Sequence, residues 1–501
     1  MRSTLALLLA LPLLAGCLEG GDGGLAGAHL VCDVACNIEA TVEPVTRQAN
    51  ELSIAVNPMD PDNVIATGKD YTPEYAGDCV WDGLYVTHDG GRTWADSNVP
   101  GSNWKRLTGD PSEPVNEFSR YWCATDPVVA FGPDGTAYWA VMPYQCDRLS
   151  GSKVGRGVAP DGGFNDWFWT CSSMYVLVSD DGGDTWPTIR EVAFGPRLEH
   201  DKQWISVAPD GAVLLCWDRD PSYQLFGVVP GSNPAQQLAP SGVISCATSH
   251  DKGRTWTDAV DANPGWTGFL PWVDWDSANH AWMAALDGEN VIVTHSADGR
   301  TWATPVAVGQ YIDPPPGGEY GWPVVNGSDF RIFALPSLAV DRSGGPNDGA
   351  VYVAWFDHSG GDGEVVLVSS HDGGATWSPP QRLSDDDPAR KVDQFMPAIS
   401  VGPDGTLDAT WYDRRDDPAN HLFDLYYTYS VDGGRTFAPN LRVSDTSIDE
   451  QYSHHQNGAV FIGDYNDLAS SDGHAHPIWI DTRDHQADVY VAKVARPSAN
   501  G

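Results

Sequence analysis

One eight-residue pattern recurs six times along the chain, and it constrains the fold more than any other feature of the sequence. It reads Ser or Thr, any residue, Asp, any residue, Gly, any residue, Thr and an aromatic residue. The good copies are THDGGRTW at 87–94, SDDGGDTW at 179–186, SHDKGRTW at 249–256, SHDGGATW at 370–377 and SVDGGRTF at 430–437. A sixth copy, HSADGRTW at 295–302, has lost the serine and the aspartate at their usual places. Such repetition predicts one small structural unit used several times.

Each copy has the chemistry of a tight turn between two strands. The copies follow strand-like apolar runs, such as residues 365–368, and precede another short strand. The aspartate and serine side chains can bond turn amides, glycine permits a positive φ, and the aromatic residue closes the base of the hairpin. We therefore assign these turns a structural role, with no catalysis and no metal.

Larger units surround the turns. Residues 336–341, 349–355 and 365–370, with a further strand after Trp377, give the four strands of a propeller blade. Comparable units begin near Ile54, Val128, Ile205, Trp272, Ile399 and Leu468. The sequence therefore predicts an all-β chain forming a β-propeller of seven four-stranded blades, with six blades and one embellished unit as the alternative.

The last unit has no room for a fourth strand of its own. Residues 40–45 precede the first unit without belonging to a blade. We expect the segment from Thr41 to Val45 to pair with Val489 to Ala492, because this pairing closes the ring and removes an exposed edge.

The N-terminal segment has the layout of an export signal. One basic residue precedes the apolar run 5–14, which is too short to span a bilayer. The run ends in Leu14-Ala-Gly-Cys17, which resembles a lipoprotein box, and residues 18–27 are Gly-rich. We expect a signal peptide and lipobox at 1–17, a tether at 18–37 and a single propeller at 38–501. The expected location is outside the cell, lipid-anchored to the membrane through Cys17; a soluble secreted protein is the alternative.

The remaining cysteines fit an exported chain. Eight cysteines remain besides Cys17, and an even number in such a chain predicts disulfides rather than a zinc site. The expected pairs are Cys216 with Cys246, Cys146 with Cys171, Cys79 with Cys123, and Cys32 with Cys36.

The formal net charge of -39 excludes nucleic acid and acidic membrane surfaces as partners. Membrane attachment is therefore expected through the lipid alone, and the chain is expected to be a monomer.

The repeated turn is similar to the Asp-box of the sialidase superfamily, whose BNR-repeat proteins are β-propellers. This resemblance implies an exo-sialidase-type glycoside hydrolase that acts on exterior glycans. It also implies an active site on the face opposite the repeated turns, where the second and third strands of each blade connect. The alternative is a non-catalytic propeller that binds a glycan or a surface protein, because propellers carry many unrelated functions.

Aspartates recur at that opposite face. The second strand of six units ends at or near an aspartate: Asp70, Asp218, Asp287, Asp357, Asp413 and Asp481. A turn-bonding role is favoured for the first three. The cluster from Asp413 to Asp417, with Arg483, is as suited to ligand binding as to turn formation.

A second resemblance concerns Phe330-Arg331-Ile332, which is similar to the FRIP motif of sialidases with Phe333 in place of the proline. It implies that Arg331 binds a sugar carboxylate and that Asp357 is the acid/base. Arg415 and Arg483, with Asp413 beside them, would complete the substrate-binding cluster.

Sialidases use a tyrosine nucleophile, for which Tyr412 and Tyr465 are the candidates. The FRIP-like motif at Phe330-Arg331-Ile332 stands after four units here, whereas in the family it opens the propeller. No cofactor is expected, and a structural calcium in an oxygen-rich loop such as 462–467 stays an open alternative.

Overall fold

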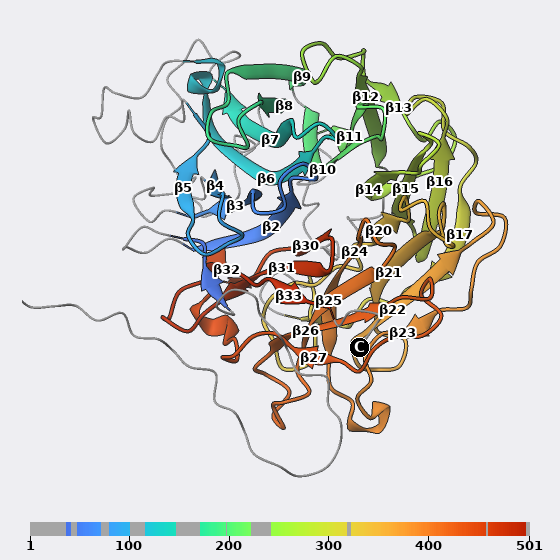
Figure 1. Cartoon of the computed structure of the whole chain (residues 1–501). Coiled ribbons are helices and arrows are strands. Elements are labelled where there is room, and N and C mark those ends of the chain that lie inside the picture. Colours follow the sequence, from blue (N-terminus) through green and yellow to red (C-terminus); the bar gives the residue numbers. More distant parts are fainter. Residues whose placement is uncertain are drawn as a thin grey trace, which may run out of the picture.

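The computed structural model describes residues 37–41, 48–71, 80–100, 116–146, 171–196, 198–221, 242–317, 322–456 and 459–496. Their regular structure is β-sheet, with three short 3-10 turns and no α-helix. The three turns are η1 (Glu117–Arg120), η3 (Pro388–Arg390) and η4 (Glu450–Tyr452). Seven antiparallel sheets surround a common centre as blades, each with its first strand innermost (Figure 1).

The first four blades follow one another along the chain. Blade 1 is β2 (Ala49–Val56), β3 (Val64–Asp70), β4 (Trp81–Thr87) and β5 (Ala95–Asn98). Blade 2 is β6 (Tyr121–Phe131), β7 (Ala137–Cys146), β8 (Cys171–Ser179) and β9 (Thr188–Pro196). Blade 3 is β10 (Leu198–Val207), β11 (Val213–Pro221), β12 (Val243–Ser249) and β13 (Val260–Asp261). Blade 4 is β14 (Phe269–Trp275), β15 (Ala281–Asp287), β16 (Asn290–Ser296) and β17 (Val306–Gln310).

The last three blades complete the ring. Blade 5 is β20 (Ser337–Val340), β21 (Val351–Asp357), β22 (Glu364–Ser370) and β23 (Gln381–Arg382). Blade 6 is β24 (Gln394–Val401), β25 (Leu407–Asp413), β26 (Asp424–Ser430) and β27 (Leu441–Arg442). Blade 7 is β30 (Asp467–Ser471), β31 (His474–Asp481) and β32 (Asp488–Val491), with β33 (Val494–Ala495) beside β31. Two small hairpins lie between blades: β18 (Pro316–Gly317) with β19 (Trp322–Pro323), and β28 (His454–Gln456) with β29 (Ala459–Phe461).

The predicted seven blades are confirmed, and each predicted unit start falls in or directly before an innermost strand. The second strands of blades 1, 4, 5, 6 and 7 end at the predicted aspartates. The aspartate-bearing turns therefore share one face of the ring. The repeated turns, which join the third and fourth strands, lie on the other face because consecutive antiparallel strands connect at alternate ends.

The ring is closed by the N-terminal strand β1 (Ile38–Glu39), which pairs antiparallel with β32 of blade 7. Ile38 lies opposite Val491, and the Ala40 amide donates to the Val489 carbonyl oxygen at 2.8 Å. The predicted closure is thus confirmed, but its strand begins at Ile38 rather than at Thr41. Residues 42–45 of the expected strand lie outside the described residues.

The repeated turns share one hydrogen-bond pattern. In the copy at 370–377, Asp372 Oδ1 accepts the Thr376 amide at 2.9 Å and Asp372 Oδ2 accepts the Thr376 hydroxyl at 2.6 Å. In the copy at 295–302, Ser296 Oγ donates to Asp298 Oδ1 at 3.0 Å, and the Thr301 amide donates to the same oxygen at 2.7 Å. The expectation that this copy lost its serine and aspartate is therefore corrected. Both residues are present, shifted by one position in a turn one residue shorter.

Polar side chains connect neighbouring blades at their inner strands. Ser53 Oγ of blade 1 accepts the Val129 amide of blade 2 at 3.2 Å, and Ser337 Oγ of blade 5 accepts the Ile399 amide of blade 6 at 3.1 Å. Asp467 of blade 7 accepts the Ile54 amide of blade 1 at 3.0 Å, so the same type of contact crosses the closure. These bonds satisfy buried amides that face the adjacent blade.

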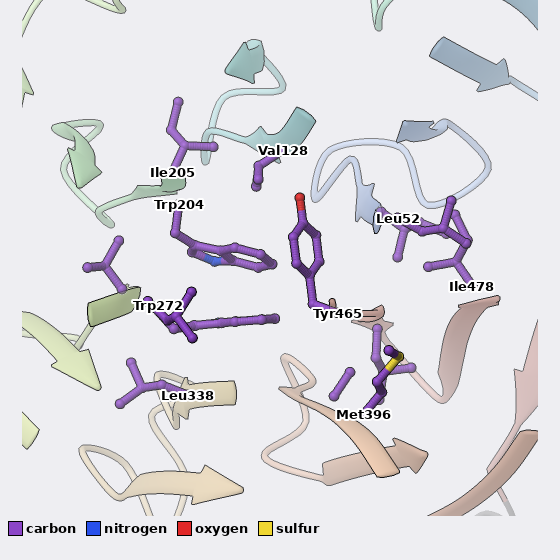
Figure 2. Close-up of a cluster of buried hydrophobic side chains, with 14 of the residues drawn as sticks. Leu52, Val128, Trp204, Ile205, Trp272, Leu338, Met396, Tyr465 and Ile478 are labelled. Carbon is purple, nitrogen blue, oxygen red and sulfur yellow. The ribbon is translucent and has the colours of Figure 1, made fainter. Parts of the chain in front are cut away.

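Apolar and aromatic side chains from all seven blades meet around the axis (Figure 2). The Trp204 and Trp272 rings are stacked with centroids 3.4 Å apart, and the Tyr465 ring stands edge-on to Trp204. All three side chains are largely buried. The middle of the ring is therefore filled by side chains, as in a packed core.

One predicted disulfide is confirmed. Cys216 and Cys246 face each other across β11 and β12, with Cα atoms 4.1 Å apart, and are joined. Cys123 is also disulfide-bonded, and its predicted partner Cys79 lies outside the described residues. The side chains of Cys146 and Cys171, as well as Cys32 and Cys36, also lie outside them. Those pairings stay predictions.

Candidate functional site

The innermost strand of five blades carries a bulge near its first residues, and one residue at each bulge has a positive φ. These residues are Glu51 (52°), Asp126 (55°), Lys202 (48°), Leu270 (60°) and Met396 (52°). Non-glycine residues rarely adopt this conformation, which costs about 1–3 kcal/mol and is concentrated at functional sites. A bulge also changes the direction of a side chain. The repeat of this feature around the ring identifies the axis as the place to look for a site.

The charged residues at these bulges meet one another. Lys202 Nζ lies 2.8 Å from Glu51 Oε1, 3.0 Å from Asp126 Oδ2 and 2.8 Å from Asp464 Oδ2. Lys69 Nζ, from the end of β3, lies 2.7 Å from Asp126 Oδ1 and also pairs with Glu51. Three blades and the segment before β30 therefore supply one ionic network. We call Glu51, Lys69, Asp126, Lys202, Arg331 and Asp464 the axial cluster.

Arg331 is the accessible member of the axial cluster. Its Nε donates to Asp464 Oδ1 at 2.7 Å and its Nη2 donates to Asp464 Oδ2 at 2.6 Å. Its side chain is 24% exposed, whereas the side chains of the other five members are at most 10% exposed. The guanidinium carbon lies 4.5 Å from the centroid of the Phe461 ring and 5.7 Å from that of Trp322. Its bonds to Asp464 use Nε and Nη2.

The axial cluster lies at the end of the axis opposite the repeated turns. In blade 1, Ala49 pairs with Asp70 and Asp70 with Trp81, whereas Val64 pairs with Thr87, where the first repeated turn begins. Glu51 is therefore close to the end at which β3 and β4 connect. This is the face on which the sequence predicts an active site.

The pKa values of two neighbouring carboxyl groups of the cluster are shifted in opposite directions. Burial, together with the charge of Asp126, raises the pKa of Glu51 to about 8. Burial would also raise the pKa of Asp126, but Lys202 and Lys69 hold it well below its usual range. Glu51 therefore holds its proton more tightly than Asp126 does, a difference that supports acid/base chemistry.

The cluster brings three cations close to its carboxylates. Lys69, Lys202 and Arg331 face Glu51, Asp126 and Asp464. Arg331 and then Lys202 hold the pKa of Asp464 far below its usual value, although burial acts in the opposite direction.

Two aromatic side chains accompany the cluster. Tyr71 follows β3, and its ring is stacked on the His454 imidazole with centroids 3.6 Å apart. Burial, then the charges of His455 and Lys69, lower the pKa of His454 to about 4, so it is neutral. Tyr465 is 5% exposed, and its hydroxyl has no hydrogen-bond partner among the described residues. Lys202 Nζ lies 5.5 Å from the centroid of the Tyr465 ring.

The other two predicted arginines lie in separate ion pairs. Arg415 Nη2 donates to Asp413 Oδ2 at 2.7 Å, and Arg415 Nη1 donates to Asp385 Oδ1 at 2.6 Å. Arg483 Nη2 is 2.8 Å from Asp481 Oδ2 and 2.7 Å from Asp445 Oδ1. Arg331 instead pairs with Asp464, so the three guanidinium groups are held by three different sets of carboxylates. Their convergence on one ligand stays a prediction.

The predicted catalytic residues are also separated. Asp357 Oδ1 accepts the Ile312 amide at 3.0 Å and the Ser359 amide at 3.2 Å, which are contacts of a turn. Tyr412 is fully buried, and its hydroxyl accepts the Ile480 amide at 3.1 Å. Tyr465 is the one predicted catalytic residue at the axial cluster. Across the described ranges, no tyrosine hydroxyl donates to a glutamate beside Arg331.

Sequence analysis missed Glu51, Lys69, Asp126 and Lys202. A signal was available, because a charged residue precedes the regular part of the innermost strand in three consecutive units. Glu51 stands two residues before Ser53, Asp126 two before Val128, and Lys202 two before Trp204.

The described residues contain no group of three or more His, Cys, Asp or Glu arranged to hold a metal. They also contain no helix long and apolar enough to cross a membrane.

No family model matches the chain, and no curated protein matches it. Solved structures of similar fold include a Hadza microbial sialidase at 13% identity and a TM-score of 0.42, covering 83% of this chain and 73% of that one. A leech intramolecular trans-sialidase matches at 13% identity and a TM-score of 0.45, covering 76% and 68%. A GH93 α-L-arabinofuranosidase of Fusarium graminearum matches at 13% identity and a TM-score of 0.46, covering 92% and 98%. At these identities the similarity concerns the fold alone.

Proposed function

We propose that this protein is a glycan-directed propeller of the glycoside hydrolase type, with its reaction centre at the axial cluster. One observation carries the proposal. Glu51 and Asp126 are bound by the same two lysines, Lys69 and Lys202, while burial raises the pKa of Glu51 and the lysines lower that of Asp126. Hydrolysis of a glycosidic bond needs such a pair, one group to donate a proton and one to act as a carboxylate.

The roles follow from these pKa shifts. Glu51 donates its proton to the glycosidic oxygen as the bond to the anomeric carbon breaks, and Asp126 stabilises the positive charge that develops on the sugar. A water molecule then supplies the hydroxyl group of the released sugar, and its proton restores Glu51. Lys69 and Lys202 keep Asp126 ionised throughout.

Arg331 is the proposed ligand-binding residue. Its guanidinium is the most exposed cation of the cluster and would favour a sugar that bears a carboxylate, such as a sialic acid. The aromatic rings of Trp322 and Phe461 beside it offer apolar surface to the sugar ring. The more specific proposal is therefore that the protein acts as a sialidase.

A second function, glycan binding without catalysis, has a specific observation in its favour. The Glu51 and Asp126 side chains are at most 1% exposed, and both are engaged by lysines. The tyrosine and glutamate pair that the sialidase resemblance implies is not formed beside Arg331 among the described residues. A substrate must displace part of this network before Glu51 can donate a proton.

The proposal is tested by measuring binding and hydrolysis of a panel of sialosides and arabinosides. Arg331→Ala should weaken binding by about 2–5 kcal/mol, because it removes one partner of a desolvated charge pair. Arg415→Ala is the matched control, since it removes an arginine of the same face that is paired away from the cluster. Equal loss of binding in both variants, with unchanged folding, contradicts the proposed site.

The cellular setting is proposed from the sequence. We infer that the chain is exported and attached to the membrane through lipid on Cys17, with the propeller facing outward. The Cys216–Cys246 disulfide fits an oxidising location. The proposed partner is a glycan or a glycan-bearing surface protein.

A further inference from the structure

Arg414 directly follows the last residue of β25, and its guanidinium is completely buried. Nη1 donates to the Asn326 carbonyl oxygen at 2.9 Å and to the Asn420 carbonyl oxygen at 3.0 Å. Nη2 donates to Glu450 Oε2 at 2.9 Å and also to Ser328 Oγ. One side chain therefore serves four acceptors from three different segments.

Two of those segments carry the exposed end of the axial cluster. Asn326 and Ser328 belong to the stretch 322–336, which contains Arg331. Glu450 begins η4 and opens the stretch 450–466, which contains Asp464. Arg331 and Asp464 thus lie in two segments between blades, which we call the excursions. The Arg414 guanidinium donates hydrogen bonds to both of them.

The contacts around Arg414 join the two excursions to each other as well as to blade 6. Ser328 Oγ donates to Glu450 Oε2 at 3.1 Å, so the two acceptors of Nη2 are bonded directly. The Phe330 ring lies 5.7 Å from the Arg414 guanidinium carbon, and the Phe395 ring lies 5.5 Å from it. Phe330 is adjacent to Arg331 in sequence, so its packing helps to fix the direction in which Arg331 leaves the chain.

We propose that Arg414 is a positioning residue for the axial site, which holds the Arg331 and Asp464 segments in register so that their ion pair forms. It touches neither member of that pair. A planar guanidinium can bond acceptors on several sides at once, whereas the ammonium group of lysine has three donors on one flexible stem. The ligand-binding part of this inference rests on the proposed function; the structural coupling of the two segments does not.

The test uses the full chain with Arg414→Ala and Arg414→Lys, and Arg415→Lys as the matched control. Arg415 is the next residue, but its partners are Asp385, Ser384, Asp413 and Asn440, none of which lies in either excursion. Amide hydrogen exchange is measured in 322–336, in 459–466 and in the strands of blade 6. The affinity of a sialoside is measured on the same samples.

In Arg414→Lys and Arg414→Ala, exchange should rise about tenfold or more in both excursions together and stay unchanged in β24 to β26. Guanidinium at about 20 mM, far below denaturing concentrations, should restore slow exchange in Arg414→Ala by refilling the vacated site. Arg415→Lys should leave both excursions protected. If Arg414→Ala does not fold, the exchange rates of Arg414→Lys are compared with those of wild type instead.

Three outcomes overturn the inference: faster exchange in only one excursion, faster exchange throughout blade 6, or no rescue by guanidinium in a folded Arg414→Ala. Sialoside affinity should fall together with the loss of protection, and guanidinium should restore it. A wild-type protein that binds no glycan contradicts the proposed function instead, and the exchange experiment still decides the role of Arg414.

Discussion

Arg331 and Asp464, which are 133 residues apart in sequence, form a two-point ion pair at the axial end of the propeller. The same Asp464 carboxylate also binds Lys202, so the accessible arginine is connected to the buried part of the cluster. Any ligand that binds Arg331 therefore acts on a network that includes Glu51 and Asp126. This connection is the structural basis for placing the reaction centre at the axis.

The Cys216–Cys246 disulfide should stabilise blade 3. Replacing both cysteines with alanine should lower the free energy of unfolding by about 2–5 kcal/mol, because the link restricts the unfolded chain. Urea unfolding under non-reducing conditions measures the change. Free thiols at these two positions in the unfolded, unreduced wild-type chain would contradict the assignment.

Closure by β1 should be essential to the ring. Deleting residues 38–41 should expose the edge of β32 and should lower the melting temperature or cause aggregation. A deletion confined to residues 20–30, within the predicted tether, is the control and should leave the melting curve unchanged. If both deletions melt like the wild type, β1 does not close the ring.

The pH dependence should report on Glu51. Its pKa is raised to about 8 in the folded chain from 4.5, so the folded state binds the proton more tightly than the unfolded state. Its contribution to stability is therefore present below pH 4.5 and is lost as the pH rises towards 8. Turnover should fall over the same upper range, because the proton donor is then ionised.

Asp467 provides the control for that experiment. Burial raises its pKa to about 7, and its carboxylate connects blades 7 and 1 through Ser53 and the Ile54 amide. Asp467→Asn should change the pH dependence of stability and leave the alkaline limit of turnover in place. If the alkaline limit of turnover moves in Asp467→Asn, or is absent from wild type, Glu51 does not set that limit.

Much of the fold was predictable from the sequence because the repeat fixes the length and order of the strands in each blade. The unit starts near Ile54 and Leu468 matched innermost strands, and the missing fourth strand led directly to the closure. The sixth repeated turn was misread because the pattern was aligned on its Gly and Thr, whereas Ser296 and Asp298 keep their bonds in a turn one residue shorter.

The site was predicted less well, for two physical reasons. Arg415 and Arg483 were expected to converge on a ligand, but an acidic chain places carboxylates such as Asp413 and Asp481 close to each arginine. Glu51, Asp126 and Lys202 contribute to one cluster from three separate blades, and only closure of the ring brings them together. Arg331, chosen by motif, and Tyr465, chosen by face, both lie at the axial cluster, and their roles stay predictions.

The lipid anchor stays a prediction of the sequence, because residues 1–36 lie outside the described part of the chain. Cys17→Ser should release the protein from the membrane fraction, since the acylated thiol would be absent. Fractionation of cells that produce wild type and Cys17→Ser measures this. A variant that stays in the membrane fraction contradicts the lipoprotein interpretation.

The identity of the proton donor tests the central claim most directly, because two residues compete for that role. Glu51→Gln and Asp357→Asn should be compared with wild type for binding and hydrolysis of the same glycoside. The account predicts that Glu51→Gln abolishes turnover and retains binding, whereas Asp357→Asn, whose carboxylate holds a turn, leaves both unchanged. Loss of turnover in Asp357→Asn with normal turnover in Glu51→Gln would contradict a reaction centre at the axial cluster.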